Sequence, residues 1–231
     1  MRNVFSTALL LLCSMDFSAQ AQVLVTGAMR NTMFNGQLAG LVRMDTIAEP
    51  GVFGIGPLDH LQGELLLWDG VAYVSRATSD TSLTVQVDRE ASAPFFVHAK
   101  VHDWGEVPLP DSIAELAQLD DFLTARYAIE SRPMAFKLSG PIVRAEIHVM
   151  DLPPGAVVRS PDDAHKGRKT FVRKEVEADL LGFFSMKHKA VFTHHDTNIH
   201  LHLIDKERNW MGHVDGLRFD PRAIRLFVQV Q

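Results

Sequence analysis

Three histidines lie close together near the C-terminal end of the sequence, in the stretch NIHLHLIDKERNWMGHVD (198–215). His200 and His202 are separated by one residue, and His213 follows eleven positions later. Side chains alternate between the two faces of a β-strand, so His200 and His202 point to the same side. Imidazole nitrogens are common ligands of zinc and similar divalent ions, and this spacing is therefore compatible with a metal site.

A turn between the two histidine segments would place them on adjacent strands. The polar residues DKERN (205–209) favour a chain reversal. A turn centred between Glu207 and Arg208 places His202 opposite His213, and directly paired residues have Cβ atoms about 4.5–5.5 Å apart. The sequence therefore predicts a three-histidine metal site on two adjacent strands, with coordination positions open to water or substrate.

Carboxylates near this site have two candidate sources. The same pairing places Asp215 opposite His200, either as a fourth ligand or as an acceptor that orients the imidazole. Glu64 begins an apolar strand in LQGELLLWDG, where a charged side chain is usually just solvated. The stretch THHD (193–196) either lines the mouth of the site or forms a polar loop, and we favour the loop over direct metal ligation.

The N-terminus has the layout of a secretory signal peptide. Arg2 precedes an apolar run over residues 4–12 and a polar stretch that ends in AQA, which predicts a signal peptide over residues 1–21. The run is too short to anchor the chain in a bilayer, so we expect a secreted or periplasmic protein with no membrane contact after cleavage. The single cysteine, Cys13, lies in this leader, and its lipidation is left open. Any metal must then be bound by imidazoles and carboxylates.

The composition is that of an ordinary globular protein. The chain has 231 residues, of which 46% are hydrophobic and 22% are charged, and its net charge is −5. This acidic balance gives no basis for nucleic-acid binding. The short basic stretch HKGRK (165–169) is expected to be a solvated loop rather than an anion site.

Short apolar runs predict mostly β-strands, interrupted by one clear helix. Apolar residues at helical spacing predict that helix over residues 111–130, with a capping box between Ser112 and Glu115. We expect a mixed αβ region over residues 22–133 and a β-rich, metal-binding region over residues 134–231.

Two segments resemble the α-acetolactate decarboxylase family. FGIGPLDHLQGELLLWDGVAYVSR (53–76) is similar to the family segment that combines Gly-hydrophobic-Gly, Gly-Glu and Asp-Gly. NIHLHLIDKERNWMGHVD (198–215) is similar to its His-x-His, acidic-turn and Gly-His-Val segment, with the same spacing to the third histidine. The resemblance extends over residues 30–218, and the histidine segment is its specific part.

The resemblance implies an α+β fold with an antiparallel, β-barrel-like C-terminal region and a zinc ion on His200, His202 and His213. It implies the conversion of 2-acetolactate, a small 2-hydroxy-3-oxo acid, to acetoin and carbon dioxide. The ketone and hydroxyl oxygens of this acid can chelate one zinc ion, which stabilises the enediolate as carbon dioxide leaves. Glu64 matches the active-site glutamate and is the candidate proton relay. No organic cofactor is needed, because the ketone is the electron sink.

The sequence departs from the family pattern at two places. The position of the family's active-site arginine holds His148, a poorer carboxylate ligand than a guanidinium, and Arg144 lies about 13 Å away along the same strand. A family glutamate in a C-terminal extension has no counterpart in AIRLFVQVQ (223–231). We therefore consider Glu64 and His148 the candidate catalytic residues. A different small-molecule substrate on the same scaffold, a non-catalytic metal-binding protein and a homodimeric assembly are left open.

Overall fold

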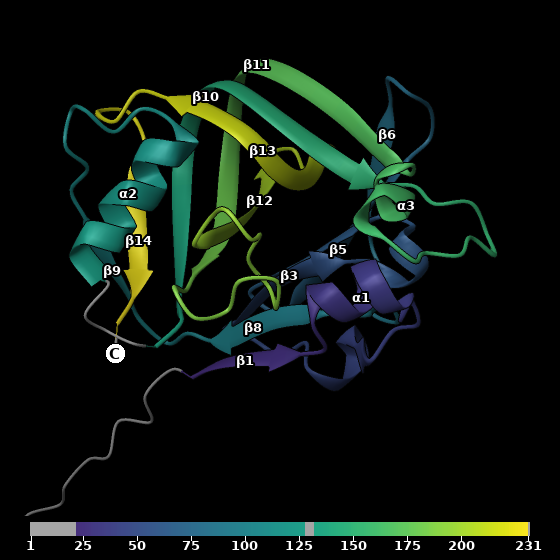
Figure 1. Ribbon diagram of the computed structural model, residues 1–231. Helices are drawn as coiled ribbons and strands as arrows, with labels where there is room; N and C mark the ends of the chain where they lie inside the picture. The colour runs from purple at the N-terminus through teal and green to yellow at the C-terminus, as the bar shows by residue number, and fades with distance from the viewer. Residues whose placement is uncertain (1–21, 128–131, 231) are drawn as a thin grey trace, which may run out of the picture.

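Two six-stranded β-sheets contain most of the strand residues of the described chain and pack against each other (Figure 1). The computed structural model describes residues 22–127 and 132–230. The first sheet has the strand order β1-β8-β3-β4-β5-β6, and the second has the order β11-β12-β13-β10-β14-β9, with a further pairing between β10 and β11. The strand pairs within both sheets are antiparallel.

The elements have the following bounds. The first sheet contains β1 (Val23–Thr26), β3 (Val52–Pro57), β4 (Glu64–Trp68), β5 (Val71–Ala77), β6 (Leu83–Val87) and β8 (Phe96–Lys100). The second contains β9 (Trp104–Val107), β10 (Met134–Met150), β11 (Arg168–Phe184), β12 (Ile199–Asp205), β13 (Met211–Phe219) and β14 (Arg225–Gln229). A two-stranded sheet pairs β2 (Val42–Arg43) with β7 (Ser92–Ala93). The helices are α1 (Met29–Asn35), α2 (Leu116–Tyr127), α3 (Pro161–His165) and the 3₁₀ turns η1 (Met44–Thr46) and η2 (Asp59–Leu61).

The alternation of side chains along β12 decides which face carries the histidines. Its odd-numbered residues Leu201 and Leu203 join the core on the α2 side of the second sheet. Ile204 instead joins the core between the two sheets, together with apolar side chains of β3, β4 and β8. Even-numbered positions of β12 therefore face the first sheet, and His200 and His202 lie on that buried face.

The predicted pairing of the histidine hairpin is confirmed. His202 pairs with His213, and Ile204 pairs with Met211, across the turn over residues 205–210. The carboxylate of Asp205 accepts hydrogen bonds from the backbone N–H groups of Asn209 (2.8 Å) and Trp210 (3.0 Å). A buried carboxylate that accepts two backbone N–H groups sets the length of the turn, and with it the register of the two strands.

The predicted helix forms, but it begins later than the capping box suggested. Helix α2 begins at Leu116, and the part of the prediction over residues 128–130 lies outside the described residues. The side chain of Gln118, not Glu115, accepts the hydrogen bond from the backbone of Ala114. Glu115 forms a backbone bridge with Arg218 of β13, which holds residue 115 in extended conformation. Tertiary pairing thus overrides the local capping signal.

The described chain is mostly β with few helices, and residues 22–127 contain α1 and α2 beside their strands. In the second sheet β11 pairs with β10 as well as with β12, but the six strands together do not close into a barrel, because β9 pairs with β14 alone among the described residues and leaves a free edge. Both β9 and α2 precede residue 133 and yet belong to the second sheet and its core. The predicted signal peptide (1–21), including Cys13, lies outside the described residues. In the part of the chain that is described, no helix is long and apolar enough to cross a membrane.

Replacing Asp205 with alanine should weaken the hairpin that carries the histidines. Two backbone N–H groups, one of them at the buried Trp210, would lose their acceptor, which corresponds to a loss of about 1–3 kcal/mol in unfolding free energy. Urea unfolding should show this for Asp205→Ala and a smaller loss for Asp205→Asn, which keeps an acceptor oxygen. The exposed Glu207 in the same turn provides the control Glu207→Ala. Equal stability of the Asp205→Ala and Glu207→Ala variants would contradict the role of this carboxylate.

Candidate metal centre

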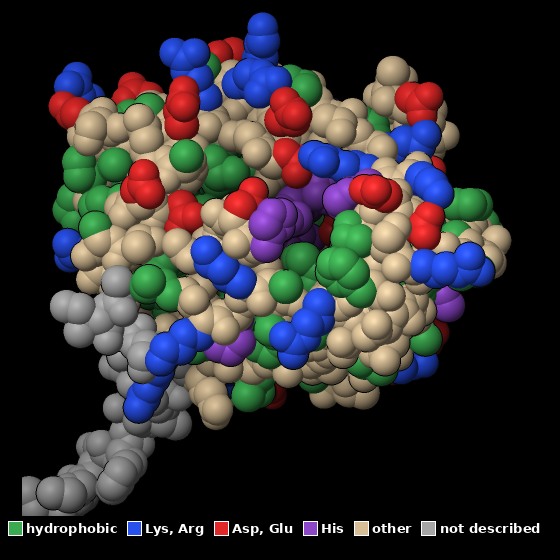
Figure 2. Space-filling view, viewed as in Figure 1, with side chains coloured by type: hydrophobic (Ala, Val, Ile, Leu, Met, Phe, Trp, Pro, Cys, Tyr) green, Lys and Arg blue, Asp and Glu red, His purple; other side chains and the backbone are tan. Residues whose placement is uncertain are grey.

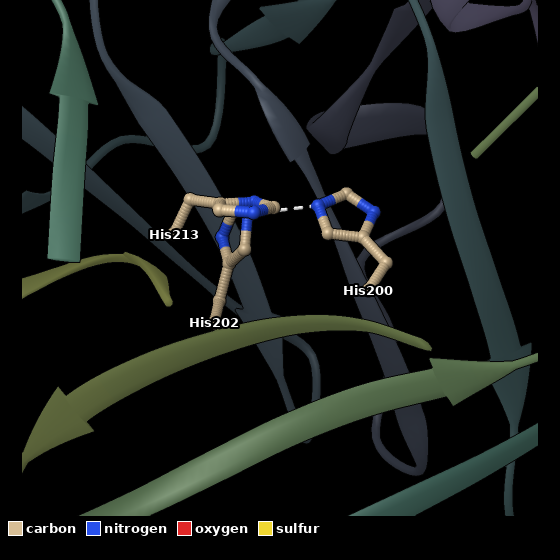
Figure 3. A group of neighbouring side chains, drawn as sticks. All are labelled: His200, His202 and His213. Carbon is tan, nitrogen blue, oxygen red and sulfur yellow. Dashed lines mark hydrogen bonds between the residues drawn. The ribbon is translucent and has the colours of Figure 1, made fainter. Parts of the chain in front are cut away.

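The three predicted histidines converge in the structure (Figure 3). One ring nitrogen from each of His200, His202 and His213 lies within 4.8 Å of the other two. The Nε2 atoms of His200 and His202 are 3.2 Å apart. All three side chains are buried. Two strands thus direct imidazole nitrogens towards one point.

Burial keeps these imidazoles in the form that binds metals. Removal from water lowers the pKa of His202 to about 3. It also lowers the pKa values of His200 and His213 well below the ordinary histidine range, and the neighbouring histidines add to the effect. A neutral imidazole has a free lone pair. Two neutral rings whose Nε2 atoms face each other at 3.2 Å can share one proton or one cation, and the donor set fits a divalent ion.

Glu64 comes from the first sheet and points into the same site. One carboxyl oxygen lies 3.6 Å from Nε2 of His202, and the other accepts a hydrogen bond of 3.2 Å from the backbone N–H of Met150. The side chain is almost completely buried. Burial raises the pKa of Glu64 well above its usual range, the Met150 hydrogen bond lowers it, and the charge of Asp215 raises it further. The environment therefore favours a protonated carboxyl beside the histidines.

Asp215 does not face His200, in contrast to the prediction from the hairpin. The paired positions of β12 and β13 end at His202 and His213. The register between β10 and β13 shifts between Glu146 and Ile147, and Asp215 is the extra residue of this bulge. The bulge turns its carboxylate towards β10 and β11. There it accepts hydrogen bonds of 2.9 Å from Nδ1 of His148. It also forms an ion pair with Arg168 at a distance of 2.7 Å.

His148, the other predicted catalytic residue, lies beside the three histidines. It is paired with His213 across β10 and β13, and the two ring centroids are 4.6 Å apart. Arg144, considered as a substitute for an arginine at position 148, forms an ion pair with Glu146 on the surface and does not line the site.

The basic stretch 165–169 is largely exposed, as predicted, but it is more than a loop, because it joins the end of α3 to the start of β11. Ser160 caps α3 by accepting a hydrogen bond from the N–H of Asp163, and Pro161 occupies the first turn. The chain then passes so close to residues 151–152 that a side chain at Gly167 would collide with their backbone. This path brings His165 and Arg168 to the histidine pocket. The spacing of charges alone carries no signal for such a contact.

The pocket is a small hollow on one face of the molecule, where the histidines gather beside acidic and basic groups (Figure 2). Its polar lining comes from both sheets and the α3 segment: Glu64, His148, His165, Arg168, His194, His200, His213 and Asp215. Its volume is about 50 Å³, whereas one water needs roughly 10–15 Å³. The pocket therefore suits a small molecule. His194, from the THHD stretch, lines it with its ring centroid 5.1 Å from that of His213.

A second group of side chains overlaps the first. His148, His213 and Asp215 also offer ligand atoms within 4.8 Å of one another. The carboxylate of Asp215 is already bound by His148 and Arg168. Because burial raises the pKa of Asp215 but the hydrogen bonds from His148 and Arg168 outweigh it, the net shift is downward and the ionised form is favoured. The three-histidine group is the better candidate for an ion, since its nitrogens have no competing cation.

Fold and pocket together define a two-sheet protein with a small, histidine-lined site suited to a divalent metal. Residues 25–230 match the family model for alpha-acetolactate decarboxylase. The chain belongs to this family, which confirms the resemblance of its two motifs.

Three proteins named alpha-acetolactate decarboxylase, each from a different organism, are similar in sequence. That from Methanosarcina mazei is 26% identical over 186 residues, which cover 80% of this chain and 62% of the relative. The protein from Bacillus licheniformis is 25% identical over 198 residues, which cover 84% of this chain and 74% of the relative. The match to the third relative, from Brevibacillus brevis, covers 66% of that protein. The chain thus spans about two thirds of the length of these relatives.

Solved structures share the fold. The alpha-acetolactate decarboxylase of Bacillus subtilis strain 168 superposes with a TM-score of 0.73 at 20% identity, over 91% of this chain and 86% of that chain. A Staphylococcus aureus protein of unknown function, described as similar to alpha-acetolactate decarboxylase, superposes with a TM-score of 0.71 at 18% identity. The superposition covers 90% of this chain and 84% of that chain. At these identities the likeness supports the two-sheet architecture alone.

Chelator-treated protein should lose stability as the pH falls from 7.5 to 5. The unfolded chain binds protons on histidine near pH 6.5, whereas the folded state keeps three buried imidazoles neutral. Stability therefore falls as the pH drops through 6.5, by up to about 2 kcal/mol per imidazole at pH 5. Urea unfolding of His200→Gln, which has one such imidazole fewer, should show a smaller fall. The exposed His195 provides the control His195→Gln. An unchanged pH dependence in His200→Gln would refute the assignment.

Proposed function

We propose that this protein is a zinc-dependent decarboxylase that converts 2-acetolactate to acetoin and carbon dioxide. The observation that carries the proposal is the cluster of three buried, neutral imidazoles beside Glu64 in a small pocket. Membership of the alpha-acetolactate decarboxylase family supports this choice of reaction. Three imidazoles that leave a coordination position open are typical of catalytic zinc.

The reaction has two stages, the loss of carbon dioxide and the addition of a proton. The bond between the carboxylate carbon and its neighbour breaks, carbon dioxide leaves, and the electron pair passes to the adjacent ketone to give an enediolate. A proton must then be added to carbon. A divalent ion held by His200, His202 and His213 would supply Lewis acidity towards the ketone and hydroxyl oxygens of the substrate.

Glu64 is suited to supply the proton. The backbone N–H of Met150 holds one of its oxygens, so the other oxygen stays on the side of His202. Burial raises the pKa of Glu64 well above its usual range, so the carboxyl carries the proton that the product carbon needs. The surrounding apolar side chains, among them Leu61 and Phe95, limit the access of water to the enediolate.

Metal removal should abolish acetoin formation by the purified protein. We expect about one divalent ion per chain by elemental analysis, acetoin from racemic 2-acetolactate, and loss of both after chelation, with recovery when zinc is added back. His213→Ala should lose the metal, because two imidazoles bind an ion more weakly than three. His195→Ala, at an exposed site near the pocket, should keep it. Stoichiometric metal without acetoin would disprove the proposed reaction and point to another small substrate.

Glu64→Gln should lower kcat by roughly 10²–10⁴-fold, the usual effect of losing a general acid. The amide keeps the size of the side chain and its acceptor for Met150, so the metal content should be unchanged. Glu177→Gln, on the exposed face of β11, is the matched control. A Glu64→Gln enzyme with wild-type kcat would show that the proton comes from another group.

A further inference from the structure

We infer that Arg168 is the anion-binding residue of the pocket and binds the carboxylate of the small acid that the site accepts. The identity of the acid rests on the proposed function, whereas the assignment of Arg168 rests on its position and charge. A guanidinium stays protonated throughout the physiological range and can present two parallel N–H donors to a carboxylate.

Arg168 is the one arginine or lysine among the described residues that line the pocket. The other polar groups there are imidazoles or carboxyls, and none of these side chains is positively charged throughout the physiological pH range. An anionic ligand therefore meets one permanently positive side chain of the protein. Arg144, the alternative on β10, pairs with Glu146 outside the pocket.

The β-ladder places Arg168 beside the residue whose backbone holds Glu64. Arg168 begins β11 and pairs with Met150 of β10. The N–H of Met150 in turn holds the carboxyl of Glu64. Arg168 and Glu64 thus border the pocket at the same level of β10, and the guanidinium, about a third exposed at 36%, lies on the solvent side. A ligand carboxylate at the mouth would leave its other oxygens deeper, near the histidines.

Asp215 positions this guanidinium but does not occupy all of its N–H donors. One terminal nitrogen of Arg168 lies 2.7 Å from the carboxylate of Asp215, which also accepts the Nδ1 hydrogen bond of His148. The guanidinium has five N–H donors, so donors remain for a second carboxylate.

Binding of two unreactive analogues to the zinc-loaded protein tests the inference. 2,3-Dihydroxy-2-methylbutanoate has the carboxylate, and 2-methylbutane-2,3-diol has a methyl group in its place. By calorimetry, Arg168→Met should weaken binding of the acid about 10–100-fold, the usual range for a lost charge-assisted contact. Binding of the diol should change less than about twofold, because only the acid uses the guanidinium. Arg168→Lys, which keeps the charge but not the paired donors, should give an intermediate affinity for the acid.

Arg144→Met is the matched control, since it removes a guanidinium from β10 outside the pocket. An equal loss of affinity for the acid and the diol in Arg168→Met would overturn the inference, because it would indicate a structural role. Unchanged binding of the acid, or no binding of the acid by the wild type, would overturn it as well. If the wild type binds the acid through Arg168 but forms no acetoin, the proposed function fails and this inference holds. If acetoin forms and Arg168→Met leaves KM and acid affinity unchanged, the inference alone fails.

Discussion

The site depends on the pairing of β12 with β13 around Asp205. Because side chains alternate along a strand, a shift of one residue would move His200 and His202 to the α2 side and bring Leu201 and Leu203 to the pocket. Two features oppose such a shift. The leucines are buried in the core against α2, and the carboxylate of Asp205 holds the backbone of Asn209 and Trp210. The same contacts that stabilise the sheet therefore keep the imidazoles together.

Burial of this cluster has an energetic consequence for the fold. Imidazoles removed from water lose solvation, and polar groups buried without full partners destabilise the folded state. The core between the sheets offsets this, since Phe53, Leu66 and Phe183 pack there in full or nearly full burial. A cation that binds only the folded chain would add to its stability.

The sequence allowed prediction of those parts of the site that depend on local patterns. Alternation along the strand and a polar turn were enough to pair His202 with His213, and the apolar run after Glu64 identified its strand. The start of α2 was wrong because Glu115 bridges to Arg218, a partner about a hundred positions away in the chain. Asp215 was misplaced because a one-residue bulge has no signature in the spacing. The path that brings Arg168 to the pocket depends on close packing at Gly167, which only the folded chain reveals.

The charged side chains of the pocket come from different strands that lie next to each other, not from successive positions of one strand. Position 148 of β10 holds an imidazole whose Nδ1 is bound to Asp215, and its ring lies against His213. The positive charge therefore comes from β11, twenty residues later in the chain but adjacent in the ladder. Asp215 joins His148 to Arg168, so a change at any one of these three residues alters the placement of the other two. For this reason the identity of residue 148, read alone, is a poor guide to the charge distribution in the pocket.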